Sequence, residues 1–185
     1  MGILDSHAEA PRTSKKQYEP LDHPAHDASP RHAPATIVAD GALRKELVGL
    51  YFRHAHIAFH NLFHQPTFTA RVEDGSIPKI LFFGIASLAA RYSTHPTLAS
   101  ITPWERGRPY RDETKRLLDL ENTSLTSIQA CMLLAAHASS EGDAMAESVY
   151  HATASRMAVL LDLPNLPTES ALEQEIHIRG KFTLS

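Results

Sequence analysis

Apolar side chains recur every three or four positions from residue 41 onward, which is the spacing of one face of an α-helix. The first stripe predicts a helix of about 18 residues that Asp40 caps. The stretch 80–90 is apolar nearly all round and predicts a helix over 78–92 in the centre of a bundle. Pro78 suits the first turn of that helix, and Ser76 is placed to cap it.

Turn and cap signals divide the remaining chain into further helices. Pro66 ends one element, a short helical turn starts at Thr67, and Asp74-Gly75-Ser76 is a turn. Further helices are predicted over 102–120 with an irregular start at Gly107 and Pro109, from Ser124, between the break at Gly142-Asp143 and Pro164, and after Thr168. No stretch alternates with a period of two. The predicted fold is therefore all-α, an irregular multi-helix bundle of about six helices.

Residues 1–40 differ from the rest in composition. They hold five of the 12 prolines and few large apolar residues, with charges of both signs mixed. Such a segment cannot bury enough apolar surface to offset the entropy lost on ordering its backbone. The sequence predicts a disordered leader over 1–40 and a helical domain over 41–185.

Composition excludes several classes of protein. The chain has 185 residues, 43% of them hydrophobic and 21% charged, with a net charge of −3. A charge this small gives no electrostatic footprint for nucleic acid or for an anionic membrane. The single cysteine, Cys131, excludes a disulfide scaffold and a cysteine-only zinc site within these residues. No window approaches the roughly 20 apolar residues of a membrane span, and no membrane partner is expected.

Histidines provide the strongest metal-ligand pattern. His56, His60 and His64 follow at i, i+4 and i+8, but no glutamate follows the first of them as a zinc-protease helix requires. Pro66 argues against one helix that reaches His64. The favoured interpretation is that these histidines are hydrogen-bonded within the protein or face solvent. A metal site at His23 and His26, in the predicted leader, is disfavoured.

Catalytic motifs are missing from the sequence. It contains no nucleophile elbow, phosphate-binding glycine loop or dinucleotide fingerprint. Cys131 lies in an apolar helical run and is interpreted as a buried small hydrophobe. No catalytic, cofactor-binding, metal or DNA-binding residue is assigned, and no enzyme is predicted. One alternative stays open, a small-molecule pocket lined by the helix at 80–90 with His64, His137 and His151.

Several strings in the helical region resemble one family when taken in order. They are Leu50-Tyr51-Phe52-x-His54-x-His56, Leu62-Phe63-His64-x-Pro66-Thr67-Phe68, Leu88-Ala89-Ala90-Arg91-Tyr92-Ser93, Arg116-Leu117-Leu118-Asp119-Leu120-Glu121, Ser124-Leu125-Thr126-Ser127-Ile128-Gln129-Ala130, Ala154-Ser155-Arg156-Met157-Ala158 and Glu173-x-Glu175-Ile176-x-Ile178-Arg179. Together they resemble the fungal-specific transcription factor domain. This is the all-α middle homology region of fungal zinc-cluster regulators, also described as the xylanolytic activator regulatory domain.

The matching positions are expected to be structural. The corner at Pro66, Thr67 and Phe68 is expected to fix where the first helix ends and the second begins. Phe68 is expected in a pocket of the bundle, as are Tyr51, Phe82 and Trp104. Arg156, beside Met157, is a candidate buried or groove-facing charge that needs a carboxylate partner. The other motif positions with an expected structural role are His56, His64 and Arg91.

The resemblance implies a transcription-regulatory protein of the nucleus. It implies that the chain forms a homodimer or a heterodimer with a complete regulator and acts on DNA only indirectly. It also implies a metabolite effector. Zinc is expected only in the six-cysteine cluster of full-length relatives, and the residues here hold one cysteine and no cofactor. The chain looks like a truncated relative, about the first half of the regulatory domain, whose uncovered apolar faces favour self-association. A helical small-molecule-binding domain and a non-functional gene-model fragment are the alternatives.

Overall fold

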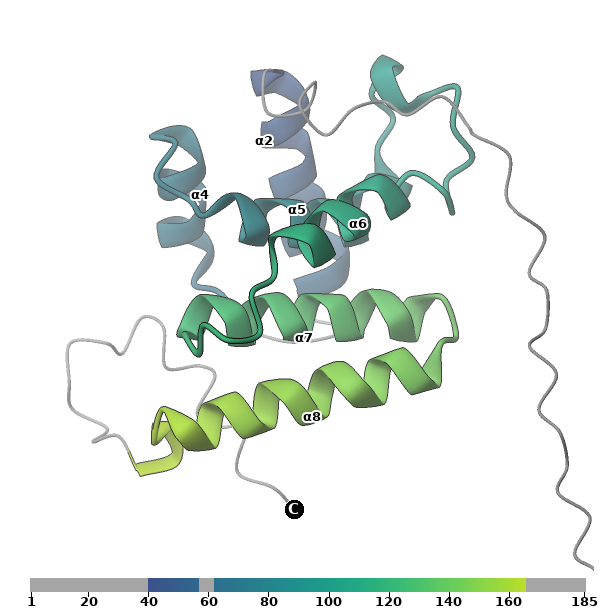
Figure 1. Cartoon of the computed structure of the whole chain (residues 1–185). Coiled ribbons are helices and arrows are strands. Elements are labelled where there is room, and N and C mark those ends of the chain that lie inside the picture. Colours follow the sequence, from purple (N-terminus) through teal and green to yellow (C-terminus); the bar gives the residue numbers. More distant parts are fainter. Residues whose placement is uncertain (1–39, 57–61, 166–185) are drawn as a thin grey trace, which may run out of the picture. The chain divides into compact units, whose positions relative to one another are not determined.

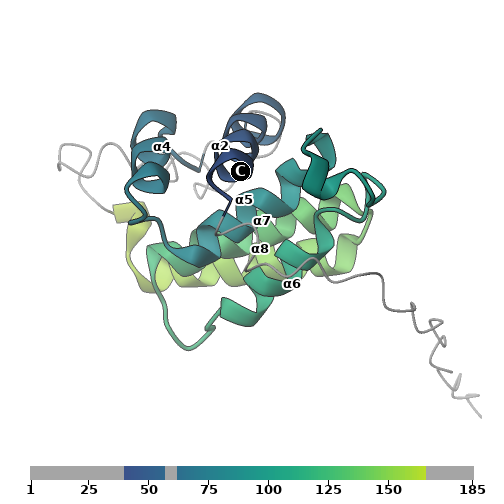
Figure 2. The same ribbon diagram turned by 90° about the horizontal axis from the view of Figure 1, so that it is seen from above.

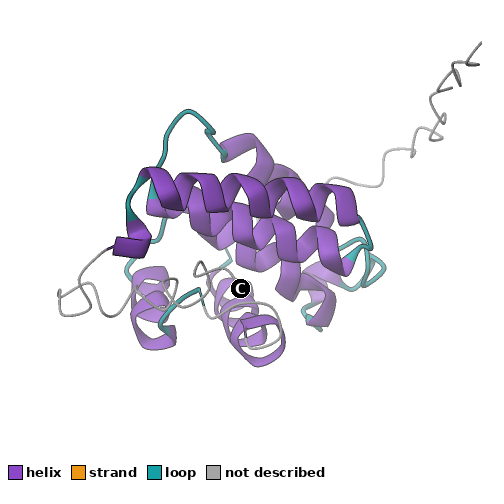
Figure 3. Cartoon of the chain, turned by 90° about the horizontal axis from the view of Figure 1, so that it is seen from below, coloured by secondary structure: helices purple, strands orange, loops and turns teal. Residues whose placement is uncertain are grey.

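The computed structural model describes residues 40–56 and 62–165, and every regular element in these residues is a helix. No strand occurs in this part of the chain, as Figure 3 shows, so the all-α prediction is confirmed. The described residues form six α-helices. These are α2 (Gly41–Leu50), α4 (Gln65–Glu73), α5 (Lys79–Ala89), α6 (Arg108–Leu117), α7 (Leu125–Ser140) and α8 (Ala144–Leu160).

Helix α5 forms the centre of the bundle. Each of its residues from Leu81 to Ala89 is buried, as expected for a helix that is apolar nearly all round. It packs against α2, α6 and α7, an arrangement visible in Figures 1 and 2. Gly84 allows one of these contacts, because a Cβ there would lie 2.6 Å from Leu133 Cδ1 on α7.

Helices α7 and α8 form a hairpin in which the two helices lie side by side (Figure 1). The Ser124 hydroxyl accepts a hydrogen bond from the Ser127 backbone N–H, which caps α7 as the sequence predicts. The predicted break between the helices is also confirmed. Gly142 has a φ of 76° and Asp143 caps α8 by accepting from the Ala146 N–H.

The first predicted helix differs from the observed one. Asp40 does cap α2, accepting from the N–H groups of Ala42 and Leu43 at 3.0 Å. At Tyr51 the helix widens into a π-helical turn, η1 (Tyr51–Ala55), and the His56 N–H donates to the Tyr51 carbonyl. The wider turn shifts the buried stripe by one residue, so Ala55 is buried and His54 is exposed.

Two further predictions around α5 and α6 are wrong. Pro78, not Ser76, occupies the N-cap position of α5, because the Ser76 N–H donates to the Asp74 carboxylate and closes the preceding turn. Trp104 does not enter the bundle and is 64% exposed. It lies in the turn before α6, which starts at Arg108 and ends at Leu117.

That late start follows the irregularity predicted from Gly107 and Pro109. Gly107 packs so closely on α5 that a Cβ would lie 2.1 Å from the Ser87 carbonyl oxygen. The close approach, together with a proline in the first turn, places the start of the regular helix at Arg108.

Several predictions lie outside the described residues. These are residues 1–39 of the leader predicted over 1–40, the helix after Thr168, and the histidines His23, His26 and His60. Among the helices of residues 40–56 and 62–165, none is both long enough and apolar enough to cross a membrane.

Candidate functional site

An aromatic cluster joins η1 to the corner before α4. The ring of Tyr51 contacts those of Phe52 and His56 at centroid distances of 5.2 Å and 5.7 Å. Phe68 contacts Phe52 at 5.8 Å and Phe63 at 4.6 Å. Tyr51 and Phe68 are buried, which confirms the pockets predicted for them. All five rings belong to the family strings, and Tyr51, His56 and Phe68 are the three among them with an expected structural role.

His64, Pro66 and Thr67 form the entry to α4. His64 is extended, Pro66 lies in the first turn, and His64 Nδ1 is 2.9 Å from Thr67 Oγ1. The first helix therefore does not continue to His64, as Pro66 indicated, and the three histidines do not line one continuous helix. Among the described residues, no group of three metal-ligating side chains comes together.

Two concave surfaces border this region. A cavity of about 30 Å³ lies under the corner, lined by Phe63, Phe68 and Gln129 among others, and has room for a single water molecule. A groove of about 360 Å³ runs between α2 and α4, with Arg44 and Lys45 on one wall and Gln65 and Thr69 on the other. The groove falls in the size range of small-ligand sites, whereas the cavity does not.

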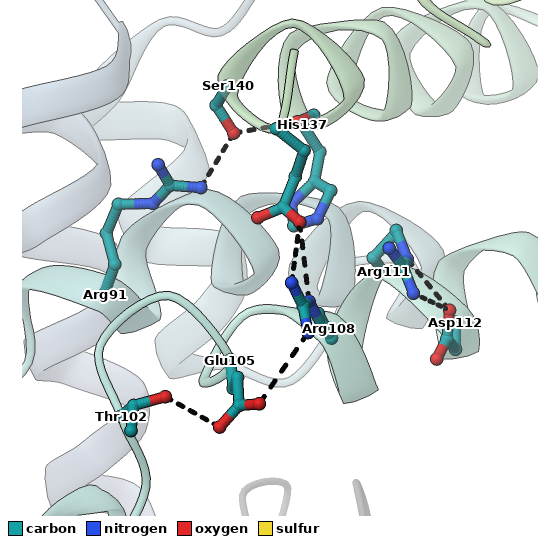
Figure 4. Close-up of polar contacts among 9 residues, drawn as sticks. Arg91, Thr102, Glu105, Arg108, Arg111, Asp112, His137 and Ser140 are labelled. Atoms are coloured by element: carbon teal, nitrogen blue, oxygen red, sulfur yellow. Dashed lines mark hydrogen bonds and ion pairs between the residues drawn. The ribbon is translucent and has the colours of Figure 1, made fainter. Parts of the chain in front are cut away.

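A polar network connects Arg91 to the C-terminal end of α7 (Figure 4). The Arg91 guanidinium donates to Ser140 Oγ at 2.7 Å, and Ser140 Oγ donates to the His137 carbonyl at 2.7 Å. The guanidinium also lies over the Trp104 ring, 5.4 Å from its centroid. Arg91 thus links the end of α5, the turn before α6 and the end of α7.

Arg108 extends this network from α6. Its guanidinium donates to the Glu141 carboxylate at 3.2 Å, and Glu105 lies 3.8 Å away on the other side (Figure 4). The Thr102 hydroxyl donates to Glu105 at 2.6 Å. The hydrogen bonds from Arg108 to Glu141 and from Arg91 to Ser140 join residues 33 and 49 positions apart. The network therefore fixes the position of the 102–108 turn on the bundle.

His137 lies beneath the network and is 1% exposed. Burial lowers the pKa of its imidazole to about 4, and the nearby Arg111 acts in the same direction, while Glu141 opposes the shift. Neither ring nitrogen has a well-formed hydrogen bond to another described residue. At neutral pH this imidazole is uncharged, and because it is buried it packs within the bundle.

Cys131 is fully buried in α7, as predicted. Burial raises the pKa of its thiol to about 11, so the thiolate is scarce at neutral pH. The open alternative of a pocket lined by His64, His137 and His151 gains no support, because His137 is buried in the bundle and His64 is exposed at the corner. His151 lies on α8, 3.9 Å from Glu147.

Arg156 differs from its prediction, whereas Met157 is buried as expected. The arginine is exposed, and no carboxylate within the described residues pairs with it. Successive residues of a helix point in different directions, so adjacent positions can have different environments. Met157 and Ala154 face α7, while Arg156 lies on the other side of α8. That the family-motif residues together have a structural role stays a prediction.

The sequence prediction missed Arg108, Glu141 and the Trp104 turn. The basic stretch Arg106-x-Arg108-x-x-Arg111 was visible, but its local acidic neighbours made it resemble an ordinary solvated helix face. The partner that fixes Arg108 lies 33 residues away, and no local pattern indicates it.

Comparison with known proteins finds the family and several relatives. A family model described as the fungal specific transcription factor domain matches residues 48–179. An uncharacterized transcriptional regulatory protein of Schizosaccharomyces pombe is 28% identical over 153 residues, covering 74% of this chain and 16% of that protein. A Zn(2)-C6 fungal-type transcription factor of Fusarium oxysporum is 25% identical over 107 residues, covering 54% of this chain and 10% of that protein.

The chain thus spans a sixth or less of the length of these curated relatives. No solved structure gives a significant match. The family match covers well over half of the chain, and it includes every helix of the described bundle from the end of α2 onward. Since both the ordered strings and the family model point the same way, the chain belongs to the fungal specific transcription factor domain family.

Proposed function

We propose that this chain regulates transcription as a protein-binding regulatory domain and acts on DNA only through a partner or an attached module. The family match over residues 48–179 is the observation that carries this proposal. The chemistry of the described residues agrees with it. The thiol of Cys131 is buried and largely protonated, and the imidazole of His137 is buried and neutral.

Indirect action on DNA follows from charge and from cysteine content. The chain carries a net charge of −3, and sequence-independent phosphate contacts need clustered lysine and arginine. One cysteine cannot build the six-cysteine zinc cluster expected in complete regulators, so we expect no zinc cluster of this kind within these residues. The unfolding temperature is expected to stay unchanged when a chelator is added.

A reporter assay tests the regulatory role. The full chain is fused to an unrelated DNA-binding module in yeast, and expression from the matching promoter is expected to change at least about threefold. Leu133→Asp, which places a charge in the core between α5 and α7, is expected to abolish the effect. The matched variant Gly49→Ala, at a position with open space around it, is expected to retain it.

A DNA-binding titration tests whether the chain acts on DNA only through a partner. If the purified chain bound one duplex sequence tightly, and the binding persisted as salt was raised, action through a partner would be wrong. A fluorescent fusion is expected to accumulate in the nucleus. Co-expression with a tagged complete regulator is expected to recover this chain in the same complex, as dimerisation requires.

A metabolite effector has one candidate location in the described residues. The groove between α2 and α4 is about 360 Å³, and its lining carries two cations, Arg44 and Lys45, and one carboxylate, Glu73. The net positive charge of this lining suits small carboxylates and phosphates. Saturation of a thermal shift by a small anionic metabolite, lost in Lys45→Glu, would support this location. An unchanged shift in Lys45→Glu would contradict it.

A further inference from the structure

The groove between α2 and α4 holds two charged side chains that the described fold does not use. Lys45 lines the groove from α2 and Glu73 lines it from α4, and both are exposed. Neither side chain forms an ion pair or a hydrogen bond with another described residue. The two charges have opposite signs and line one groove, yet they form no ion pair with each other.

Arg44, the third charge in the lining, is held by the fold. Its guanidinium donates to the Val72 carbonyl at 2.7 Å and so binds a backbone acceptor in the last turn of α4. The same guanidinium lies over the Phe82 ring, 5.6 Å from its centroid. Arg44 thus joins α2 to α4 and α5. The charges left for a ligand are one ammonium, on Lys45, and one carboxylate, on Glu73.

The contact of Arg44 also places these two charges at one level of the groove. Lys45 follows Arg44 on α2, and Glu73 follows Val72 on α4. The hydrogen bond from Arg44 to Val72 therefore brings together the two segments that carry Lys45 and Glu73. The ammonium and the carboxylate border the same part of the groove.

The rest of the lining suits a compact ligand. Val48 and Val72 are buried side chains that give the groove an apolar part, and Gln65 and Thr69 add an amide and a hydroxyl. Nothing lies within 4 Å of the Cβ position of Gly49, so this part of α2 offers bare backbone. The volume of about 360 Å³ is at the lower end of the range for small-molecule sites.

We infer that this groove binds a free α-amino acid, with the ligand carboxylate at Lys45, its ammonium at Glu73 and its side chain against Val48 and Val72. The inference rests on the proposed function, because it names the ligand class for the groove that we proposed as the effector location. It goes beyond that function in requiring both charges of the ligand and not its negative charge alone.

Other small ligands match only part of this lining. A monocarboxylate leaves Glu73 without a partner, and an amine without a carboxylate leaves Lys45 without one. A phosphate or a dicarboxylate brings a second negative charge toward Glu73, which repels it. An α-amino acid pairs both side chains at once through charge-assisted hydrogen bonds. Because both side chains are exposed, each pair contributes little, and binding is expected in about the millimolar range.

Thermal unfolding of the full chain tests the inference, with each standard L-amino acid added at increasing concentration. At least one is expected to raise the unfolding temperature until the effect saturates. That amino acid is then compared with two analogues, the carboxylic acid that lacks its α-amino group and the amide that lacks its carboxylate. Each analogue is expected to bind at least about fivefold more weakly, since each loses one charge pair.

Variants of the two charges assign each preference to its side chain. In Glu73→Gln, the amino acid and the acid without the amino group are expected to bind equally. In Lys45→Met, the amino acid and its amide are expected to bind equally. Glu121→Gln and Lys79→Met are the matched controls, because both residues are exposed and lie outside the groove, and they are expected to keep both fivefold preferences. Circular dichroism checks that each variant is folded.

Three results would overturn the inference. They are the absence of a saturable shift with every amino acid, equal binding of the amino acid and the acid without the amino group to the unchanged chain, and fivefold preferences that persist in both groove variants. The second result would leave the groove as the site of an anionic effector, so the location proposed above would stand. The reporter assay measures the regulatory role without any added ligand, so failure of that role is distinguished from failure of amino-acid binding.

Discussion

At the scale of single residues, Gly107 is needed for its missing side chain and not for its backbone conformation. Its φ of −78° is open to any residue, but an added Cβ would lie 2.1 Å from the Ser87 carbonyl oxygen and 3.3 Å from His137 Cε1. The obstacle is main chain, which cannot move aside as a flexible side chain does.

Gly107→Ala is therefore expected to lower the free energy of unfolding by about 1–3 kcal/mol, because α5 and α6 must separate. Urea unfolding measures the change. Gly49→Ala in α2 is the matched control, since nothing lies within 4 Å of its Cβ position, and it is expected to stabilise the helix by about 0.5–1 kcal/mol. Equal effects of the two substitutions would contradict this account.

His137 makes stability depend on pH. Burial lowers its pKa to about 4 from an ordinary value near 6.5, so the unfolded chain binds a proton more readily than the folded one. Stability from the neutral imidazole is fully present above about pH 6.5 and declines as the pH falls toward 4. Arg111 and Arg91 add to this shift, while Glu141 and the Ser87 backbone act against it.

The free energy of unfolding is expected to fall by up to about 3 kcal/mol across that range through His137 alone. The difference between the original chain and His137→Phe isolates this contribution, because the other titrating groups are common to both. Unfolding curves at several pH values between 7 and 4 provide the measurement. A constant difference across the range would show that His137 is not the group responsible.

At the scale of elements, the pair Arg108 and Glu141 joins the start of α6 to the end of α7. Glu141 is mostly covered, and the 3.2 Å contact forms between segments far apart in the chain. A double-mutant cycle with Arg108→Met and Glu141→Gln is expected to give a coupling of about 0.5–1 kcal/mol, reduced by salt.

The matched pair for this cycle is Arg116 and Glu113, which are bonded within α6 at i, i+3 and lie more openly to solvent. Its coupling is expected to be smaller than that of Arg108 and Glu141, because solvent screens an exposed pair. A larger coupling for this local pair than for Arg108 and Glu141 would show that the network does not fix α6 on α7.

Comparison of elements also shows which features local sequence can predict. The caps at Asp40 and Ser124 and the break at Gly142-Asp143 act within a few residues, and each is confirmed. The central position of α5 followed from its uniformly apolar composition. The π-helical turn at Tyr51 was missed, because a one-residue shift of the stripe leaves the apolar spacing nearly unchanged.

The site was less predictable than the helices for a related reason. The positions in the family strings were recognised, but the contacts of Arg91 with Ser140 and with Trp104 join distant segments. Arg156 was expected to be buried or to face a groove beside Met157, yet neighbouring residues of a helix point in directions about 100° apart. Which of the two faces α7 depends on how α8 packs, and composition does not determine that.

At the scale of the whole molecule, Cys131 reports whether the described helices unfold together. The thiol is fully buried in α7, the helix that packs against both α5 and α8, and it is the only thiol in the sequence. A thiol reagent can reach it only when these helices separate, since burial both covers the sulfur and raises its pKa to about 11.

Labelling of Cys131 across a urea series is therefore expected to share its midpoint with the loss of helical circular dichroism, to within about 0.3 M. Coincident midpoints mean that α5, α7 and α8 form one cooperative unit. Labelling at clearly lower urea would instead show that α7 loses its cover before the rest of the bundle unfolds.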